Sequence, residues 1–191
     1  LMLEGMPNYR SGVDGLRVSN STKGGITFAA STTQNGIHMI TVVLGVEAVD
    51  GDPYARFVAT SSLMNYVVRT FVSSIVVKEG DPYGKSKATI MDGKSETVLA
   101  VAKKDFYIVE KQGSQAEPKI QFKSDQESFR APVKSGTNLG KIHYTDPDKI
   151  GRGYLEDQEP TVDMVAGRTI EKSFFLKVWW NEFVRYVNEK L

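Results

Sequence analysis

The chain has 191 residues, a formal net charge of +1, no cysteine and a hydrophobic fraction of 40%. This content can bury one good core or two small ones, and the near-zero charge excludes general attraction to nucleic acid. The absence of cysteine excludes disulfides, a thiolate nucleophile and a cysteine-ligated zinc site. The two histidines, His38 and His143, lack the spacing of metal ligands, so we expect no metal, no cofactor and no nucleic-acid partner.

The first residues have neither the basic start nor the long apolar run of a signal peptide, and the chain begins with Leu1 rather than methionine. We therefore expect a portion of a longer protein. No stretch of the sequence is apolar for long enough to predict a transmembrane helix.

Three apolar runs predict strands in the N-terminal part of the chain, at residues 13–18, 26–32 and 37–46. The last two are separated by a segment that contains Asn35-Gly36, and an Asn-Gly pair is the strongest short signal for a β-hairpin. The third run is almost continuously apolar and rich in β-branched residues, which is typical of a central, well-buried strand.

A helix is predicted to follow, with Asp52 as its N-cap and Pro53 as its first helical residue. Phe57, Met64 and Phe71 repeat every seven residues, which indicates one buried stripe. Two pairs four residues apart extend this stripe, Tyr54 with Val58 and Leu63 with Val67. Three strands and one helix form a thin layer, so we expect its far face and sheet edge to need covering by something that these residues do not supply.

The pattern changes at residue 73 to short strands separated by Gly, Pro and Asp. Turn signals such as Gly80-Asp81-Pro82 and Asp146-Pro147-Asp148 recur at the spacing of an all-β sandwich. The candidate strands are 74–78, 88–91, 97–101, 106–110, 119–123, 131–133, 141–144 and 161–165. The sequence therefore predicts a second, all-β domain with a sandwich-like fold.

The stretch 168–191 contains no Gly or Pro, and its apolar residues recur with the period of a helix. Polar residues in its middle make spanning a bilayer costly, whereas two adjacent tryptophans and a tyrosine favour the headgroup boundary. The alternative is that the apolar face packs on the protein's own core or on a partner. The residues expected to contact lipid are Phe175, Leu176, Trp179, Trp180, Phe183, Tyr186 and Val187.

A segment that begins at Val13 reads V-D-G-L-R-V-S. It resembles the third active-site strand of the low-molecular-mass penicillin-binding proteins, the serine-type D-alanyl-D-alanine carboxypeptidases, where it reads V-D-G-x-K-T-G. Residues 131–140, A-P-V-K-S-G-T-N-L-G, are similar to the A-P-V-x-x-G-x-x-x-G stretch of that family's C-terminal β domain. The closing residues 174–180 are similar to the membrane-anchoring tail of the streptococcal members.

The resemblance implies an exported protein that trims the terminal D-alanine from peptidoglycan stem peptides. It also implies a mechanism in which the serine of an S-x-x-K motif is activated by the lysine and assisted by S-x-N and K-T-G motifs. Penicillins acylate the same serine. The expected partners of the full-length parent are therefore stem peptides, β-lactams and a membrane lipid surface.

The chain lacks most of this apparatus. No Ser is followed three residues later by Lys, and no Ser-x-Asn occurs. At the K-T-G positions, Arg17 keeps the positive charge, Val18 loses the hydroxyl, and Ser19 adds a side chain where the family has glycine. These residues form either a rudimentary carboxylate-binding strand or a strand that merely completes the sheet, and three simultaneous changes favour the second reading.

We therefore expect an α+β chain in three parts. Residues 1–72 would be the remnant of a penicillin-binding, β-lactamase-like domain, 73–166 the C-terminal β domain, and 167–191 a helix lying on the membrane. The expected function is that of the C-terminal portion of a D-alanyl-D-alanine carboxypeptidase in cell-wall maturation, inactive alone and without catalytic residues. The alternative is a truncated, non-enzymatic β module that docks or spaces cell-wall partners. The expected location is extracytoplasmic, peripheral on the outer face of the cytoplasmic membrane.

Overall fold

A computed structural model of the chain shows two compact units. One is formed by Leu1–Ser74 and Val109–Ser114, and the other by Ile75–Ile108 and Gln115–Leu191. The chain passes from one unit to the other within β4 (Phe71–Val77) and β7 (Phe106–Lys111), which form a two-stranded sheet. The structure describes all residues except 16, 22–24, 47–51, 53, 116, 150, 152, 155–157, 175–177, 181–182, 185 and 188–191.

The first unit contains an antiparallel sheet of β1 (Arg17–Ser21), β2 (Gly25–Gln34) and β3 (Ile37–Val46), in that order. The predicted hairpin between β2 and β3 is confirmed. Asn35 and Gly36 have φ angles of 52° and 75°, the left-handed conformations that a two-residue type I′ turn requires. This turn fixes the register in which β2 and β3 pair.

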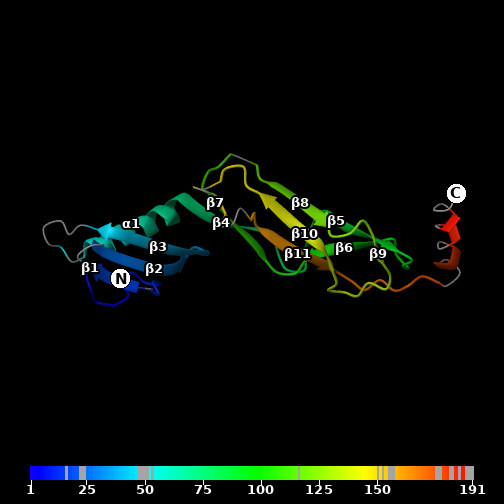
Figure 1. Cartoon of the computed structure of the whole chain (residues 1–191), viewed down its shortest axis with the longest axis horizontal. Coiled ribbons are helices and arrows are strands. Elements are labelled where there is room, and N and C mark those ends of the chain that lie inside the picture. Colours follow the sequence, from blue (N-terminus) through cyan, green and yellow to red (C-terminus); the bar gives the residue numbers. More distant parts are fainter. Residues whose placement is uncertain are drawn as a thin grey trace. The chain divides into compact units, whose positions relative to one another are not determined.

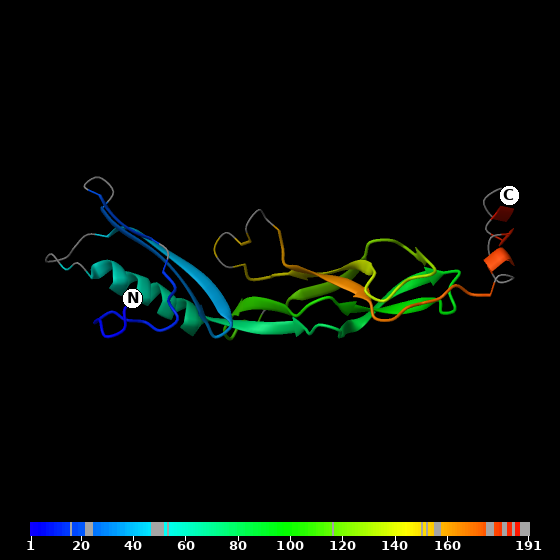
Figure 2. The same ribbon diagram turned by 90° about the horizontal axis from the view of Figure 1, so that it is seen from below.

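Helix α1 (Ala55–Thr70) lies along one face of this sheet (Figure 2). It begins later than predicted, with Tyr54 as an N-cap that makes no side-chain capping bond. The Asp52 carboxylate accepts a hydrogen bond from the backbone N–H of Tyr54 at 2.8 Å, while Pro53 lies outside the described residues. The prediction that Asp52 caps the helix is therefore wrong, because its carboxylate closes a turn ahead of the helix instead.

The buried stripe of α1 agrees only in part with the predicted one. Met64 is fully buried, and Phe57 packs edge-to-face on Phe28 of β2 with ring centroids 5.1 Å apart. The predicted members Tyr54, Val58 and Leu63 are exposed, because positions 56, 60 and 64 face the sheet instead. The buried core of this unit comprises Leu1, Val13, Phe28, Ala30, Ile37, Met39 and Met64.

The far face of this sheet is open among the described residues, as expected. Ile40, Val42 and Leu44 of β3 expose 61%, 56% and 73% of their surface. The prediction of a central, well-buried third strand is wrong for this structure, since β3 lies at the sheet edge and its residues alternate between buried and exposed. Its composition suits burial on both faces, but in the described part of the chain α1 covers only one.

The second unit contains a six-stranded sheet in which neighbours pair antiparallel, except for the parallel pair β5–β9 (Figure 1). Each predicted strand of this region overlaps an observed one except 131–133, where the strand lies at 129–130 instead. The mainly β character is thus confirmed, while the sandwich-like packing stays a prediction. The order is β8 (Lys119–Ser124), β10 (Asn138–Thr145), β11 (Thr161–Ala166), β6 (Thr97–Ala102), β5 (Pro82–Met91) and β9 (Phe129–Arg130).

The C-terminal helix does not begin at Arg168 as predicted. Ile170 is buried and exchanges two backbone hydrogen bonds with Val133, of 3.0 and 2.8 Å, and Lys172 forms a bridge with Gly93. Residues 168–173 are therefore not helical, because Ile170 contributes to the core of the second unit. Helical residues follow at 178–180, 183–184 and 186–187.

Candidate functional site

The predicted substrate-binding residues Arg17, Val18 and Ser19 lie on β1, the strand at one edge of the three-stranded sheet. All three side chains are exposed. Their backbone is held by the ladder to β2, and the hydroxyl of Thr27 adds a hydrogen bond to the Ser19 carbonyl oxygen at 3.2 Å. The strand is therefore fixed at the edge where an extended ligand could reach it.

The side chains of these residues do not converge on one point. Val18 pairs with Phe28, so the two side chains point to the face that α1 covers. Arg17 pairs with Ala29 and, by the alternation of a strand, points to the open face together with Ser19. Within the described residues the Arg17 guanidinium has no hydrogen bond or ion pair, so its charge is free to meet an anion.

The V-D-G residues that precede β1 have a structural role. Val13 is buried in the core of the first unit and forms a bridge with Thr32, and the backbone N–H of Asp14 donates to the Ser31 carbonyl oxygen at 2.9 Å. Gly15 has a φ of +66°, and a Cβ at this position would overlap the sulfur of Met2. The chain thus keeps the part of the motif that positions the strand, whereas the part that would contact substrate is altered.

The A-P-V stretch also has a structural role, in the second unit. Ala131, Val133 and Leu139 are buried in its core. Gly140 has a φ of +148°, and a Cβ there would overlap the backbone carbonyl oxygen of Lys123 on the neighbouring strand β8. The second resemblance therefore falls on residues that packing and backbone approach require, and it indicates a shared fold rather than a binding site.

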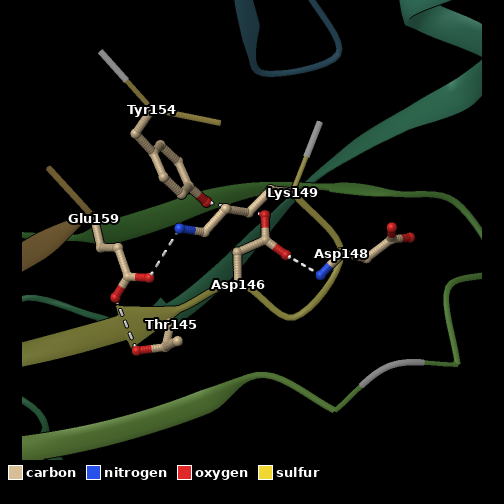
Figure 3. A network of polar contacts seen from close by, with 6 residues as sticks. All are labelled: Thr145, Asp146, Asp148, Lys149, Tyr154 and Glu159. Carbon is tan, nitrogen blue, oxygen red and sulfur yellow. Dashed lines mark hydrogen bonds and ion pairs between the residues drawn. The ribbon is translucent and has the colours of Figure 1, made fainter. Parts of the chain in front are cut away.

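The loop between β10 and β11 carries a polar network, shown in Figure 3. Glu159 uses both carboxylate oxygens: Oε2 accepts a hydrogen bond from the Thr145 hydroxyl at 2.9 Å, and Oε1 lies 3.5 Å from Nζ of Lys149. These contacts fasten the loop to the end of β10. Both oxygens of Glu159 are thus engaged in holding the loop, which favours a structural role over a catalytic one.

Asp146 holds the other half of this network. Its Oδ1 accepts a hydrogen bond from the backbone N–H of Asp148 at 2.9 Å, and its Oδ2 accepts one from the Tyr154 hydroxyl at 3.2 Å (Figure 3). Burial, reinforced by the charge of Asp146, raises the pKa of Tyr154 above the ordinary value of 10.0. The sequence signalled only a turn here, because nothing in it shows that Tyr154 returns to Asp146.

The residues expected to contact lipid are exposed where the structure describes them. Trp179, Trp180, Phe183 and Tyr186 expose 61%, 58%, 48% and 60% of their surface. The rings of Trp179 and Phe183 stack with centroids 6.0 Å apart, as the four-residue spacing of a helix allows. Val187 is half-buried, whereas Phe175 and Leu176 lie outside the described residues.

The described residues include no helix that is both long and apolar enough to cross a bilayer. In the same part of the chain, no group of three or more His, Asp or Glu side chains is placed to hold a metal ion.

Comparisons with known proteins place these features in a family. Residues 71–172 match the model of the family described as "Penicillin-binding protein 5, C-terminal domain". The D-alanyl-D-alanine carboxypeptidase DacA of Haemophilus influenzae is 26% identical over 133 residues, which cover 69% of this chain and 32% of that protein. DacD of Salmonella typhimurium is 22% identical over 138 residues, covering 72% of this chain and 34% of that protein. The chain thus spans about a third of the length of these relatives.

Solved structures agree with this result. A protein described as a peptidoglycan synthesis regulatory factor (PBP3) from Streptococcus pneumoniae is 44% identical, with a TM-score of 0.82 over 89% of this chain and 46% of that one. Penicillin-binding protein 5 from Haemophilus influenzae is 22% identical, with a TM-score of 0.59 over 84% of this chain and 43% of that one. At that identity the second likeness shows the fold alone.

Proposed function

Because the chain belongs to the family of the penicillin-binding protein 5 C-terminal domain, we propose that it is the C-terminal portion of a D-alanyl-D-alanine carboxypeptidase. In this proposal the parent acts on peptidoglycan stem peptides in cell-wall maturation and is acylated by β-lactams. Support comes from the curated relatives, which are named as carboxypeptidases of this type and are about three times as long as the matched segments. The observation that carries the proposal is the family match across β4 to β11.

This chain by itself is proposed to hydrolyse nothing. Acyl transfer needs a serine whose proton is taken by a lysine one helical turn away, and the sequence has no Ser-x-x-Lys. The altered strand β1 supports the same conclusion, since Val18 offers no hydroxyl and points away from Arg17. Arg17 could meet a substrate carboxylate, but binding without a nucleophile does not cleave an amide bond.

Incubation with a fluorescent penicillin and with a stem peptide ending in D-Ala-D-Ala tests this proposal. We expect no covalent label on the 191-residue chain by intact mass spectrometry and no release of D-alanine. A full-length carboxypeptidase such as DacA of Haemophilus influenzae serves as the positive control. A β-lactam adduct on any side chain of this polypeptide would overturn the assignment of inactivity.

We further propose that the C-terminal residues hold the protein on the outer face of the cytoplasmic membrane. The exposed aromatic side chains of Trp179, Trp180 and Phe183 support this, because each large apolar group contributes about 1.5–3 kcal/mol when fully buried. The basic residues of the segment add about 1 kcal/mol each near an anionic surface and are partly offset by its glutamates. Apolar insertion therefore dominates over charge attraction.

Flotation with anionic lipid vesicles at low and high salt tests the membrane proposal. We expect binding that salt weakens little and that Trp179→Glu plus Trp180→Glu abolishes. The matched control is Tyr66→Glu plus Tyr107→Glu, which changes two aromatic residues of similar exposure elsewhere in the chain. Release by salt with the tryptophan variant still bound would contradict the proposal.

The second candidate function is a non-enzymatic, membrane-attached β module that docks or spaces cell-wall partners. The changes at all three K-T-G positions favour it, since they would be tolerated in a chain that catalyses nothing. The two candidates differ in the reading frame upstream of Leu1. A frame that continues back through a Ser-x-x-Lys supports the enzyme, and a frame that starts close to Leu1 supports the module.

A further inference from the structure

A groove on the exposed face of the sheet in the second unit is not used by the proposed function. It has a volume of about 580 Å³ and is lined by residues of β5, β6 and the turns before β5 and after β11. The two faces of β6 differ here: Val98 and Ala100 point into the core, whereas Thr97 and Leu99 are exposed. The groove therefore lies on the solvent side of a well-packed sheet.

A register shift between β5 and β6 shapes this groove. Pro82 pairs with Val101 and Lys87 pairs with Leu99, so residues 83–86 of β5 lie opposite Ala100 alone. The hydroxyl of Ser86 fills the space left in the ladder by donating to the Ala100 carbonyl oxygen at 2.8 Å. Extra residues on one strand bend it away from the plane of the sheet, and such bulges are common beside binding sites.

The floor of the groove is apolar, and a glycine forms its boundary on the β11 side. Pro82, Leu99 and Val101 supply the apolar surface, of which Leu99 is nearly half exposed. Gly167 bounds the groove on the β11 side, and its backbone N–H donates to the Leu99 carbonyl oxygen at 3.0 Å. A Cβ at Gly167 would come 3.0 Å from Cγ1 of Val101, so any larger residue would crowd the floor.

Two cations lie on opposite sides of this floor. Lys87 is the partner of Leu99 on β5, and Arg168 follows Gly167 on the β11 side. Since neighbouring strands are about 4.8 Å apart, their backbones are separated by roughly 10 Å across β6. Among the described residues that line the groove, none is acidic; Asp81 and Glu96 are close in sequence but do not line it.

We propose that this groove binds an extended acidic peptide segment of a partner protein, with an aliphatic side chain on Leu99 and carboxylates beside Lys87 and Arg168. Charge complementarity selects the acidic residues, because two cations flank the floor with no carboxylate between them. The apolar floor favours a side chain of leucine size over the alanine methyl groups of a stem peptide, because the larger side chain buries more apolar surface on Leu99 and Val101. This binding goes beyond the proposed function and is independent of any peptidase chemistry.

Fluorescence anisotropy of the 191-residue chain with a labelled peptide tests the proposal. The probe is fluorescein-Gly-Glu-Leu-Glu-Gly-amide, and its matched control replaces both glutamates by glutamine. We expect saturable binding of the acidic peptide that weakens roughly tenfold or more in Lys87→Glu plus Arg168→Glu. Leu99→Ala, which leaves the charge unchanged, should weaken binding about threefold.

The control variant is Lys119→Glu plus Lys123→Glu, which makes the same change of charge on the exposed strand β8 at the other end of the sheet. It should alter the affinity by less than roughly twofold, since charges at that distance are screened. Thermal unfolding followed by circular dichroism tests whether each variant is folded. If Lys87→Glu plus Arg168→Glu does not fold, Lys87→Gln plus Arg168→Gln is used in its place.

The proposal would be overturned if the glutamine peptide bound as tightly as the acidic one, or if the Lys119 and Lys123 variant lost as much affinity as the Lys87 and Arg168 variant. It would also be overturned if the acidic peptide did not bind at millimolar concentration. Preferential binding of a soluble stem peptide, or of anionic vesicles through Lys87 and Arg168, would also reject a protein partner in favour of that ligand.

Discussion

The Nε atom of Arg130 lies 3.5 Å from Oδ2 of Asp92. The Asp92 side chain is 2% exposed and the Arg130 side chain 60% exposed, so the cation reaches a buried carboxylate from the solvent side. The backbone of Asp92 is also used, because its carbonyl oxygen accepts a hydrogen bond from Ser173 N–H at 2.8 Å. The pair thus connects the end of β5 to the residue that immediately precedes the A-P-V stretch.

Removal of this cation should destabilise the second unit. We expect Arg130→Ala to lower its free energy of unfolding by about 1–3 kcal/mol, because a buried carboxylate loses a charged partner. Urea unfolding followed by far-UV circular dichroism measures the change. Lys123→Ala, at an exposed position of the same sheet, should stay within about 0.5 kcal/mol of the parent. Equal effects of the two substitutions would refute a special role for the pair.

The two glycines of the A-P-V stretch should differ in their tolerance of alanine. Gly136 has a φ of +83° and nothing within 4 Å of an added Cβ, so alanine there should cost only the backbone strain of about 1–2 kcal/mol. Gly140 adds to such strain an overlap with the Lys123 carbonyl, so Gly140→Ala should cost clearly more and disturb the β8–β10 ladder. Thermal unfolding ranks the two variants, and hydrogen exchange locates the damage. A ranking in the opposite order would show that the ladder adapts.

Truncation of the buried methionine in α1 should loosen the first unit. Met64 is fully buried between α1 and the sheet, so Met64→Ala is expected to cost about 2–5 kcal/mol. Val58→Ala, on the exposed side of the same helix, is the matched control and should cost less than about 1 kcal/mol. Hydrogen exchange of the β2 and β3 amides reports the loss. Similar protection in both variants would argue against a core at Met64.

Tyr154 should titrate later than an exposed tyrosine. Burial, followed by the charge of Asp146, raises its pKa, so the folded state favours the neutral phenol. The stability that this preference contributes is fully present below pH 10 or so and is lost as the pH rises above it. Ultraviolet absorbance at alkaline pH should show a late phase that Tyr154→Phe removes. Asp146→Asn should shift that phase only partway towards the ordinary value, because burial remains.

A control is needed for that titration, because the pKa of a second tyrosine is also raised. The hydrogen bond and charge of Asp105 raise the pKa of Tyr107. Tyr107 is exposed, so Asp105→Asn should return its phase to the ordinary range while leaving that of Tyr154 unchanged. A Tyr154 phase that responds to Asp105→Asn would show that the two signals had been confused.

Much of the fold follows from local pattern. The Asn35-Gly36 turn and the short strands of the second unit were predictable because turn chemistry and alternation act over a few residues. The start of α1 was not, since Asp52 could close a turn as readily as cap a helix. The sequence predicts a helix from Arg168 because the stretch lacks Gly and Pro, but Ile170 is buried and bridges to Val133, so packing outweighs the helical pattern there.

For the candidate sites too, features set by local sequence were predictable and features set by distant contacts were not. The position of Arg17 on a strand was predictable from the V-D-G stretch, and the alternation of that strand separates Val18 from it. The groove beside Leu99 was not predictable, because it arises from a register shift that becomes visible only when Pro82 and Lys87 are seen against their partners. The link from Tyr154 to Asp146 likewise depends on how a loop returns.

The two-residue turn at Asn35-Gly36 also decides which side of β3 is the inside. Ile37 and Met39 point beneath the helix, while His38 and Ile40 point outward. One inserted residue in the turn would exchange these two sets, sending the imidazole inward and the methionine into water. The length of this one turn therefore determines which side chains of the ten-residue strand β3 face the helix.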